Sequence, residues 1–291
     1  MQFTNIEESH DILANGRPFI NVLDKGFVEL VEINPRVADK SKPLGIESII
    51  TDAARTSYLT ADKPKLSTDR GLLRYLMRNE HWTPYEMANL TFRIRLPLFV
   101  HAQMVRHRTA KQNVQSARYS VMPDLFYVPE RVRKQSDTNK QGSSDEFVDD
   151  ETADLFYSAL EKQIDIYSTY TKLIEKGVTK ELARILLPQN LYTECYWQSD
   201  LRNLFNFMKL RLDKHAQYEI RQYAEAIYQI TKKYFPQSVS AFDDYILNSL
   251  TLTSPELKGE IKGREAREFE NKKIYMKEFV NGEETSELFS K

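Results

Sequence analysis

The stretch Asn89–Val100, NLTFRIRLPLFV, carries the pattern that decides the fold. Apolar and polar side chains alternate along it, with Leu90, Phe92, Ile94 and Leu96 on one side and Thr91, Arg93 and Arg95 on the other. Strict alternation predicts a β-strand with one face in the core. Proline is well suited to the first position of a helix, so we predict a helix that begins at Pro97 and runs to Arg106.

Upstream of this strand, FINVLDKGFVELVEI (19–33) predicts two short strands joined by a hairpin turn at Asp24-Lys25-Gly26. The segments 46–58 and 69–80 repeat apolar residues at helical spacing. Strands and helices are mixed without regular βαβ alternation. We therefore predict an α+β fold, with a central mixed or antiparallel sheet flanked by helices in a single domain.

Downstream, the sequence predicts a long amphipathic helix that Gly177 ends and a shorter one that Thr179 caps. NLYTECYWQ (190–198) reads as a strand, and helices follow over 200–212, 215–235 and 240–247. We expect an N-terminal extension (1–17), a catalytic domain (18–250) with a mobile polar loop at 133–150, and a charged tail (251–291).

The amino-acid composition argues against several classes of function. The net charge of −1 over 291 residues argues against a globally basic nucleic-acid binder. Nine glycines form no dinucleotide or P-loop motif, and the five histidines lack metal-ligand spacing, so no metal site is expected. A single cysteine, a polar N-terminus and the lack of a long apolar run favour a soluble cytosolic protein without membrane partners.

Arginines gather in a few places. Arg106-His107-Arg108 follows the predicted helix. A single guanidinium group can bind two oxygens of a phosphate or carboxylate at the same time. The alternative is a solvated basic loop. Further along, two polar pairs are each four residues apart and so would share a helix face, namely Arg202 with Asn206 and Arg211 with His215. Internal carboxylates at Glu181, Asp213 and Glu219 are the alternative partners to a ligand anion.

These residues resemble the signature of the flavin-dependent thymidylate synthases: RHR, seven residues, then Ser116 and Arg118. The segments LDKGFVELV, AARTSY, HWTPYEM, LPLFVHAQ, ELARILLPQNLYT and NLFNFMKLRLDKHAQYEIRQYA also resemble that family, in family order, from Leu23 to Leu247. The resemblance implies methylation of dUMP at C5 to give dTMP. It implies 5,10-methylenetetrahydrofolate as carbon donor, FAD as cofactor and NADPH as reductant. It also implies a homotetramer with active sites shared between subunits.

The resemblance assigns roles residue by residue. Nucleotide-binding positions are Gln103, Arg106, Gln115, Ser116, Ala117, Arg118, Arg184 and Arg211. Arg118 would bind the phosphate, and Arg211 would hold the carbonyl edge of uracil and stabilise charge as C5 becomes nucleophilic. Ser116 would lie near the pyrimidine as a nucleophile or a positioning group, and no base is visibly paired with it. Arg211 and Ser116 are thus the predicted catalytic residues.

The flavin positions implied by the resemblance are Ser57, His81, Glu86, Arg106, His107, Arg108, Arg202 and Asn206. His81 and Glu86 would lie beside the ring on which folate stacks. Each residue also has an ordinary structural role open to it, such as a helix cap or a turn. Cys195, among aromatic residues, reads as a small buried residue and not as a nucleophile.

Five residues depart from what the family often shows: Met87, Lys111, Val114, Ala117 and Asp200. Asp200 has a simple explanation as a helix N-cap. The changed loop residues leave open a related enzyme that adds a hydroxymethyl group instead of a methyl group. A non-catalytic nucleic-acid-binding module that uses Arg106–Arg108 is the third hypothesis, and the near-zero net charge weighs against it.

Overall fold

The computed structural model describes residues 11–12, 16–36, 42, 44–57, 68–137 and 139–260, with isolated positions between 262 and 272. The chain forms two compact units, Met1–Phe242 and Asp243–Lys291, which are described separately. The first unit thus ends at Phe242, somewhat before the boundary expected at residue 250. Most of the expected N-terminal extension (1–17) lies outside the described residues.

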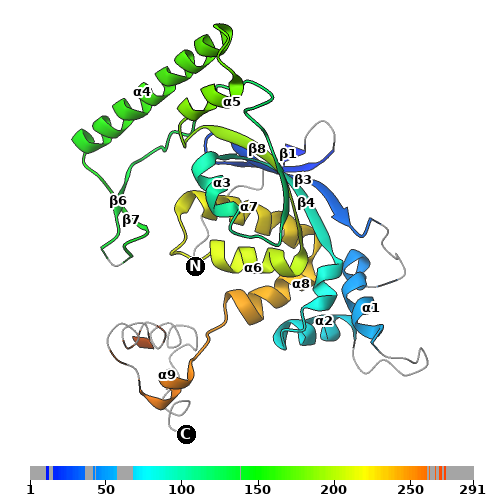
Figure 1. The fold of residues 1–291 in the computed structure, drawn as a ribbon. Coiled ribbons are helices and arrows are strands. Elements are labelled where there is room, and N and C mark those ends of the chain that lie inside the picture. The colour runs from blue at the N-terminus through cyan, green and yellow to red at the C-terminus, as the bar shows by residue number, and fades with distance from the viewer. Residues whose placement is uncertain are drawn as a thin grey trace. The chain divides into compact units, whose positions relative to one another are not determined.

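A six-stranded sheet forms the centre of the first unit (Figure 1). Its strands, in spatial order, are β1 (Asp11–Ile12), β2 (Pro18–Val22), β3 (Gly26–Asn34), β4 (Asn89–Pro97), β8 (Tyr192–Asp200) and β5 (Lys111–Val114). Every neighbouring pair is antiparallel. The predicted α+β class with a central antiparallel sheet is therefore confirmed.

The predicted strand at 89–96 is β4, which lies between β3 and β8. Its apolar side chains are fully buried, and its polar ones are partly exposed on the other face. Pro97 keeps an extended backbone and pairs with Tyr192, so it is the N-cap residue of the next helix and not its first helical residue. The helix α3 (Leu98–Met104) consequently begins one residue later than predicted.

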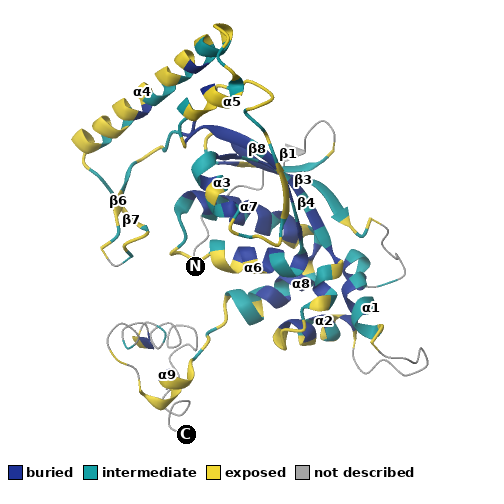
Figure 2. Ribbon diagram, in the orientation of Figure 1, coloured by how far each residue is buried: buried dark blue, intermediate teal, exposed yellow. Residues whose placement is uncertain are grey.

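The helices of the first unit are α1 (Ser48–Arg55), α2 (Asp69–Arg78), α3, α4 (Asp150–Glu175), α5 (Lys180–Ala183), α6 (Leu201–Arg211), α7 (Tyr218–Tyr234) and α8 (Pro236–Phe242). Short 3-10 turns are η1 (Gly45–Glu47), η2 (Thr83–Met87) and η3 (Arg184–Leu186). Helix α7 contacts β2 and β3, and α6 contacts α7 and β8. Together they cover the apolar face of the sheet, where buried side chains concentrate (Figure 2).

Several predicted helix ends are confirmed by their capping contacts. Asp200 accepts a hydrogen bond from the amide of Asn203 and caps α6. Thr179 caps α5 in the same way, through the amide of Leu182. Gly177 follows the C-cap of α4 with a φ of +92°, a conformation that suits glycine. Side-chain caps act within a few residues, which is why the local sequence reveals them.

The predicted mobile loop at 133–150 instead contains a two-stranded hairpin of β6 (Arg133–Gln135) and β7 (Ser143–Phe147). Lys134 and Glu146 pair across it at 3.0 Å, and Arg131 stacks 3.5 Å from the ring centre of Phe147. These strands are short and polar, so they lack the apolar alternation that would have predicted them.

The C-terminal part also differs in detail from the prediction. Pro236 does follow the end of α7, but it begins α8 rather than a connecting loop. The single helical piece predicted over 240–247 is divided between the end of α8 and a π-helical turn, η4 (Asp243–Leu247), in the second unit. That unit also contains α9 (Ser254–Lys258), where Thr253 and Glu256 form a capping box.

Candidate active site

His107 and Arg211 meet where the end of α6 faces the turn after α3. Arg211 donates a hydrogen bond from Nε to Nε2 of His107 at 3.0 Å. The imidazole lies edge-on to Phe207, with ring centres 4.8 Å apart. Burial and then the charge of Arg211 lower the pKa of His107 to about 4. His107 is therefore a neutral acceptor that fixes the guanidinium by one nitrogen.

Arg211 itself is only half-exposed, and burial lowers its pKa from the ordinary value for arginine. Within the described residues, no carboxylate pairs with it. A partly desolvated cation without a counter-ion interacts strongly with any anion or carbonyl oxygen that approaches it. Arg211 and His215 do not share a helix face, because α6 ends at Arg211. His215 turns back to Asp213, with Nδ1 and Oδ1 2.8 Å apart.

Arg106 and Arg108 flank His107 and are both exposed. The amide of Arg106 donates to the carbonyl oxygen of Gln103 at 3.3 Å, which continues the last turn of α3. Neither guanidinium has a carboxylate within salt-bridge distance in the described part of the chain. Both are thus available to an anionic ligand, or to solvent.

The segment that carries Ser116 and Arg118 leaves the edge strand β5. Gln115 anchors it by donating its amide hydrogen to the carbonyl oxygen of Glu194 at 2.8 Å. The hydroxyl of Ser116 accepts from the amide of Arg118 at 3.3 Å, so it is used inside its own turn. Ala117 packs against the buried cluster of Met122, Phe126 and Leu191. No hydrogen-bonded general base accompanies Ser116 in the described structure.

Arg118 and Arg184 meet at Glu181 on α5. The guanidinium Nε of Arg118 lies 3.6 Å from the carboxylate of Glu181. Arg184 donates from Nε to the carbonyl oxygen of Glu181 at 3.2 Å. All three residues are exposed, so this pair of arginines faces solvent beside Glu181. Glu181 is thereby the internal partner that the sequence allowed.

A third group lies at the start of α6. Arg202 is 3.7 Å from the carboxylate of Glu86, and Asn206 lies exposed one turn further along the helix. His81 is exposed and sits edge-on to Tyr75, with ring centres 5.8 Å apart. Ser57 is exposed in the turn after α1, where its amide donates to the carbonyl oxygen of Ala54 at 3.4 Å.

Direct contacts therefore connect the predicted residues in separate groups and not in one pocket. The groups are His107 with Arg211, Arg118 with Arg184 through Glu181, and Glu86 with Arg202. The predicted alternative partner Glu219 pairs instead with Arg133 at 2.6 Å, and Asp213 pairs with His215. Gln217, which hydrogen-bonds Gln103, was not among the predicted site residues.

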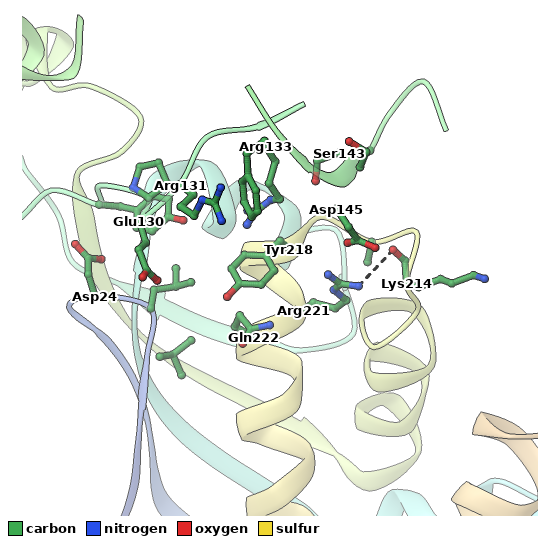
Figure 3. A pocket seen from close by; sticks show the side chains of 18 of the residues that line it. Asp24, Glu130, Arg131, Arg133, Ser143, Asp145, Lys214, Tyr218, Arg221 and Gln222 are labelled. Carbon is green, nitrogen blue, oxygen red and sulfur yellow. Dashed lines mark hydrogen bonds between the residues drawn. The ribbon is translucent and has the colours of Figure 1, made fainter. Parts of the chain in front are cut away.

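A cavity of about 1020 Å³ opens beside the β6–β7 hairpin (Figure 3). Tyr218 lies in its middle, and the guanidinium of Arg133 stacks 3.9 Å from the ring centre. Arg131, Arg133, Lys214 and Arg221 contribute positive charge, and Asp24, Glu130 and Asp145 contribute negative charge. None of the residues predicted for the active site lines this cavity.

Cys195 is buried in β8, opposite Ile94 of β4. Burial, and then the charge of Glu194, raise the pKa of its thiol to about 12. The prediction that Cys195 is a small buried residue is confirmed. The described residues contain no cluster of His, Cys, Asp or Glu suited to a metal ion. None of the described helices combines the length and apolar character that a membrane crossing requires.

Comparison with known proteins gives consistent matches. Residues 41–237 match the family described as "Thymidylate synthase complementing protein". The flavin-dependent thymidylate synthase of Dictyostelium discoideum is 43% identical over 279 residues, which cover 91% of this chain and 90% of that protein. A protein of the same name from Thermus thermophilus is 44% identical, covering 82% of this chain and 83% of that protein.

A solved structure is similar as well. It is the UMP/dUMP methylase PolB of Streptomyces cacaoi, bound with 5-Br dUMP. The TM-score is 0.66 at 27% identity, and the match covers 79% of this chain and all of that one. The antiparallel sheet and its covering helices are therefore shared with an enzyme that was solved with a pyrimidine nucleotide bound.

Proposed function

Because the chain belongs to the flavin-dependent thymidylate synthase family, we propose that it methylates dUMP at C5 to give dTMP. The carbon comes from 5,10-methylenetetrahydrofolate, and NADPH supplies the reducing equivalents. The methylene group replaces the C5 proton of uracil, and a hydride then reduces it to methyl. The observation that carries the proposal is Arg211, held by neutral His107 and lacking a carboxylate partner in the described residues.

Arg211 suits the uracil edge. Its Nε is occupied by His107, so its terminal nitrogens are the donors left for a ligand. Two donors side by side match a carbonyl oxygen on which negative charge grows as C5 becomes nucleophilic. His107 is neutral well below pH 7, so it adds no competing positive charge. In this role Arg211 is a catalytic residue.

The phosphate end of dUMP suits Arg118 and Arg184. Arg118 lies beside the carboxylate of Glu181, and Arg184 donates to the backbone carbonyl oxygen of the same residue. Both arginines are exposed, so a phosphate can displace the carboxylate from Arg118 at small cost. The nucleotide site further comprises Gln103, Arg106, Gln115, Ser116 and Ala117. Because the hydroxyl of Ser116 is engaged with the amide of Arg118 and has no base beside it, we assign it a positioning role.

The flavin site is proposed at Ser57, His81, Glu86, Arg106, His107, Arg108, Arg202 and Asn206. The fit rests on charge: Arg106 and Arg108 are exposed cations with no carboxylate partner in the described structure, as a diphosphate requires. When bound, FAD would supply hydride transfer to the one-carbon unit. His81 and Glu86 are exposed or half-exposed, which leaves their edge of the site open to folate.

A homotetramer accounts for the separation of these groups. Contacts within one chain bring Arg118 to Arg184 and His107 to Arg211, but no contact recorded among the described residues joins the two pairs. A bound dUMP must reach both pairs at once, because its uracil ring is assigned to Arg211 and its phosphate to Arg118 and Arg184. We therefore propose that subunits share active sites, as the family resemblance implied. The cytosolic location remains a prediction that rests on the single cysteine, the polar N-terminus and the lack of a long apolar run.

The proposal is tested by absorption spectroscopy of the purified protein with FAD. We expect bound flavin that NADPH bleaches under anaerobic conditions, at a rate that depends on dUMP. With methylenetetrahydrofolate present, mass spectrometry should identify dTMP. A protein that binds no flavin, or one whose flavin is indifferent to dUMP, would contradict the proposal.

A hydroxymethylated product is the second candidate. Lys111 and Val114 motivate it, since they change the charge of the edge strand next to the nucleotide segment, and Lys111 is exposed opposite Gln198. The same mass measurement separates the two products, because hydroxymethyl-dUMP carries one oxygen more than dTMP. Detection of dTMP alone would exclude this candidate. Salt-dependent binding of a random oligonucleotide without turnover would support the nucleic-acid-binding alternative instead.

A further inference from the structure

A chain of hydrogen bonds links Gln103 on α3 to the β6–β7 hairpin. Gln103 donates from Nε2 to Oε1 of Gln217, in a very short contact. Gln217 donates from its own Nε2 to Oε2 of Glu219 at 2.7 Å. The other carboxylate oxygen of Glu219 accepts from Arg133 at 2.6 Å and from the hydroxyl of Tyr127 at 3.1 Å.

The carboxylate at the end of this chain determines its direction. An ionised carboxylate only accepts hydrogen bonds, so Gln217 must turn its amide NH₂ toward Glu219. Its carbonyl oxygen then faces Gln103, which must donate. Gln103 is left with one N–H and its carbonyl oxygen for a ligand. If Gln217 could flip its amide, it would present a donor to Gln103 and reverse that pattern.

The arrangement is held firmly at its inner end. Glu219 is only 6% exposed, and the side chain of Arg133 is 21% exposed. A charge-assisted bond in such surroundings is stronger than a neutral one on the surface. Arg133 also stacks on Tyr218 at 3.9 Å, so its guanidinium is fixed on two sides. The hairpin thereby supplies the counter-ion that holds the carboxylate of Glu219 in place.

We propose that Gln217 and Glu219, with Arg133 of the hairpin, are positioning residues that orient the amide of Gln103 for the nucleotide. This inference rests on the proposed function, in which Gln103 belongs to the dUMP site. It also gives the β6–β7 hairpin a role, since the hairpin completes the chain that ends at the substrate. Neither Gln217 nor Glu219 touches the nucleotide in this scheme; both act through Gln103.

The test is a double-mutant cycle on the FAD-loaded enzyme with Gln217→Met and Gln103→Ala. Methionine keeps the length of the side chain and removes the amide. We expect Gln217→Met to raise the KM and the Kd for dUMP about tenfold, a loss typical of one buried hydrogen bond or slightly more, with kcat nearly unchanged. In the double variant, the loss should equal that of Gln103→Ala alone, because Gln217 acts only through Gln103.

A matched control is Gln229→Met on the same helix. Gln229 donates to Glu225 at 3.2 Å and has no link to Gln103, so its variant should bind dUMP like the wild type. A second test replaces both members of the Arg133–Glu219 ion pair, so that neither is left as an unpaired buried charge. The double variant Glu219→Gln with Arg133→Gln keeps polar groups at both positions, but it removes the carboxylate that can only accept hydrogen bonds. This variant should raise the KM for dUMP without lowering kcat.

The outcomes separate the two proposals. Wild-type enzyme that neither binds nor converts dUMP would overturn the proposed function together with this inference. Wild-type turnover with additive losses in the cycle, or with no effect of Gln217→Met, would overturn the positioning role alone. A loss in kcat at unchanged KM would also overturn it, because orientation of a ground-state contact acts on binding.

Discussion

Arg211 donates to a histidine that cannot become a cation at physiological pH. The bond from its Nε to Nε2 of His107 is 3.0 Å long, and the pKa of His107 is lowered to about 4 by burial and by Arg211 itself. A neutral imidazole accepts at Nε2, so within this pair only the guanidinium carries a charge. The pair therefore presents a single, oriented cation at the end of α6.

Replacing Arg211 by alanine should lower kcat for dTMP formation by at least about a hundredfold, the loss typical of removing one donor to a developing oxyanion. Arg211→Lys should recover little, because an ammonium lacks the second, coplanar donor. Thermal unfolding should change little in either variant. Lys209→Ala is the matched control, since Lys209 is exposed two residues earlier on the same helix. Normal turnover in Arg211→Ala would remove this residue from the site.

The His107–Arg211 pair also predicts how stability depends on pH. The unfolded chain protonates His107 near its ordinary pKa of 6.5, whereas the folded protein does so only near 4. The unfolded state therefore binds more protons between these values, and the contribution to stability is complete above pH 6.5 and is lost as pH falls toward 4.

The comparison is between wild type and His107→Gln, in which an amide oxygen can replace the acceptor. Urea midpoints at about pH 7.5 and about pH 4.5, on either side of the ordinary histidine pKa, measure the difference. We expect the wild type to lose more stability on acidification than the variant does. Equal losses in the two proteins would show that His107 does not titrate as its surroundings imply.

Gly26 begins β3, and its backbone packs directly against α7. A Cβ at this position would lie 2.0 Å from the hydroxyl oxygen of Tyr223 and 2.6 Å from the carbonyl oxygen of Val22. Gly26→Ala should therefore destabilise the fold by about 1–3 kcal/mol or more, as overpacked cores do. Tyr223→Phe in the same chain removes the nearer oxygen and should recover part of the loss. Denaturant unfolding of the wild type and the two variants measures this; an unaffected Gly26→Ala would contradict the packing.

The thiol of Cys195 should be unreactive in the native protein and should take no part in catalysis. Its thiol is buried, and its pKa is raised to about 12, so almost no thiolate exists at neutral pH. Cys195→Ala should keep turnover within about twofold while losing about 1 kcal/mol or more of stability through the small cavity that it leaves. Thiol reagents should leave the native wild type active. Rapid inactivation by such a reagent, matched by an inactive Cys195→Ala variant, would restore Cys195 as a catalytic candidate.

The sequence predicted those parts of the structure that depend on near neighbours. The alternation in β4, the turn before Gly26 and the caps at Asp200 and Thr179 all act within a few residues, and each is confirmed. The hairpin at 133–147 escaped prediction because its stabilising partner, Glu219, lies 86 residues from Arg133. Gln103 and Gln217 are 114 residues apart, so their contact depends on how α3 meets the start of α7.

The roles of the site residues also could not be predicted from the local sequence pattern alone. Family resemblance predicted Arg118 and Arg184 as nucleotide ligands, but it could not show that both contact Glu181. Arg211 and His215 are spaced like partners on one helix, yet α6 ends between them. Spacing is a reliable guide only where the helix continues through both positions.

Glu181 should compete with the phosphate of dUMP for Arg118. The two side chains lie 3.6 Å apart and are 65% and 50% exposed, so their attraction is weak and screened by salt. Glu181→Gln should change the free energy of unfolding by no more than about 0.5 kcal/mol. It should lower the KM for dUMP by about twofold at low salt, because Arg118 then has no rival anion, and this gain should fade as salt is added.

Glu161→Gln on α4 removes the same charge from an exposed site without a partner in the described structure, so it controls for net charge. If both variants improve binding equally, the effect is one of overall charge, and Glu181 does not compete for Arg118.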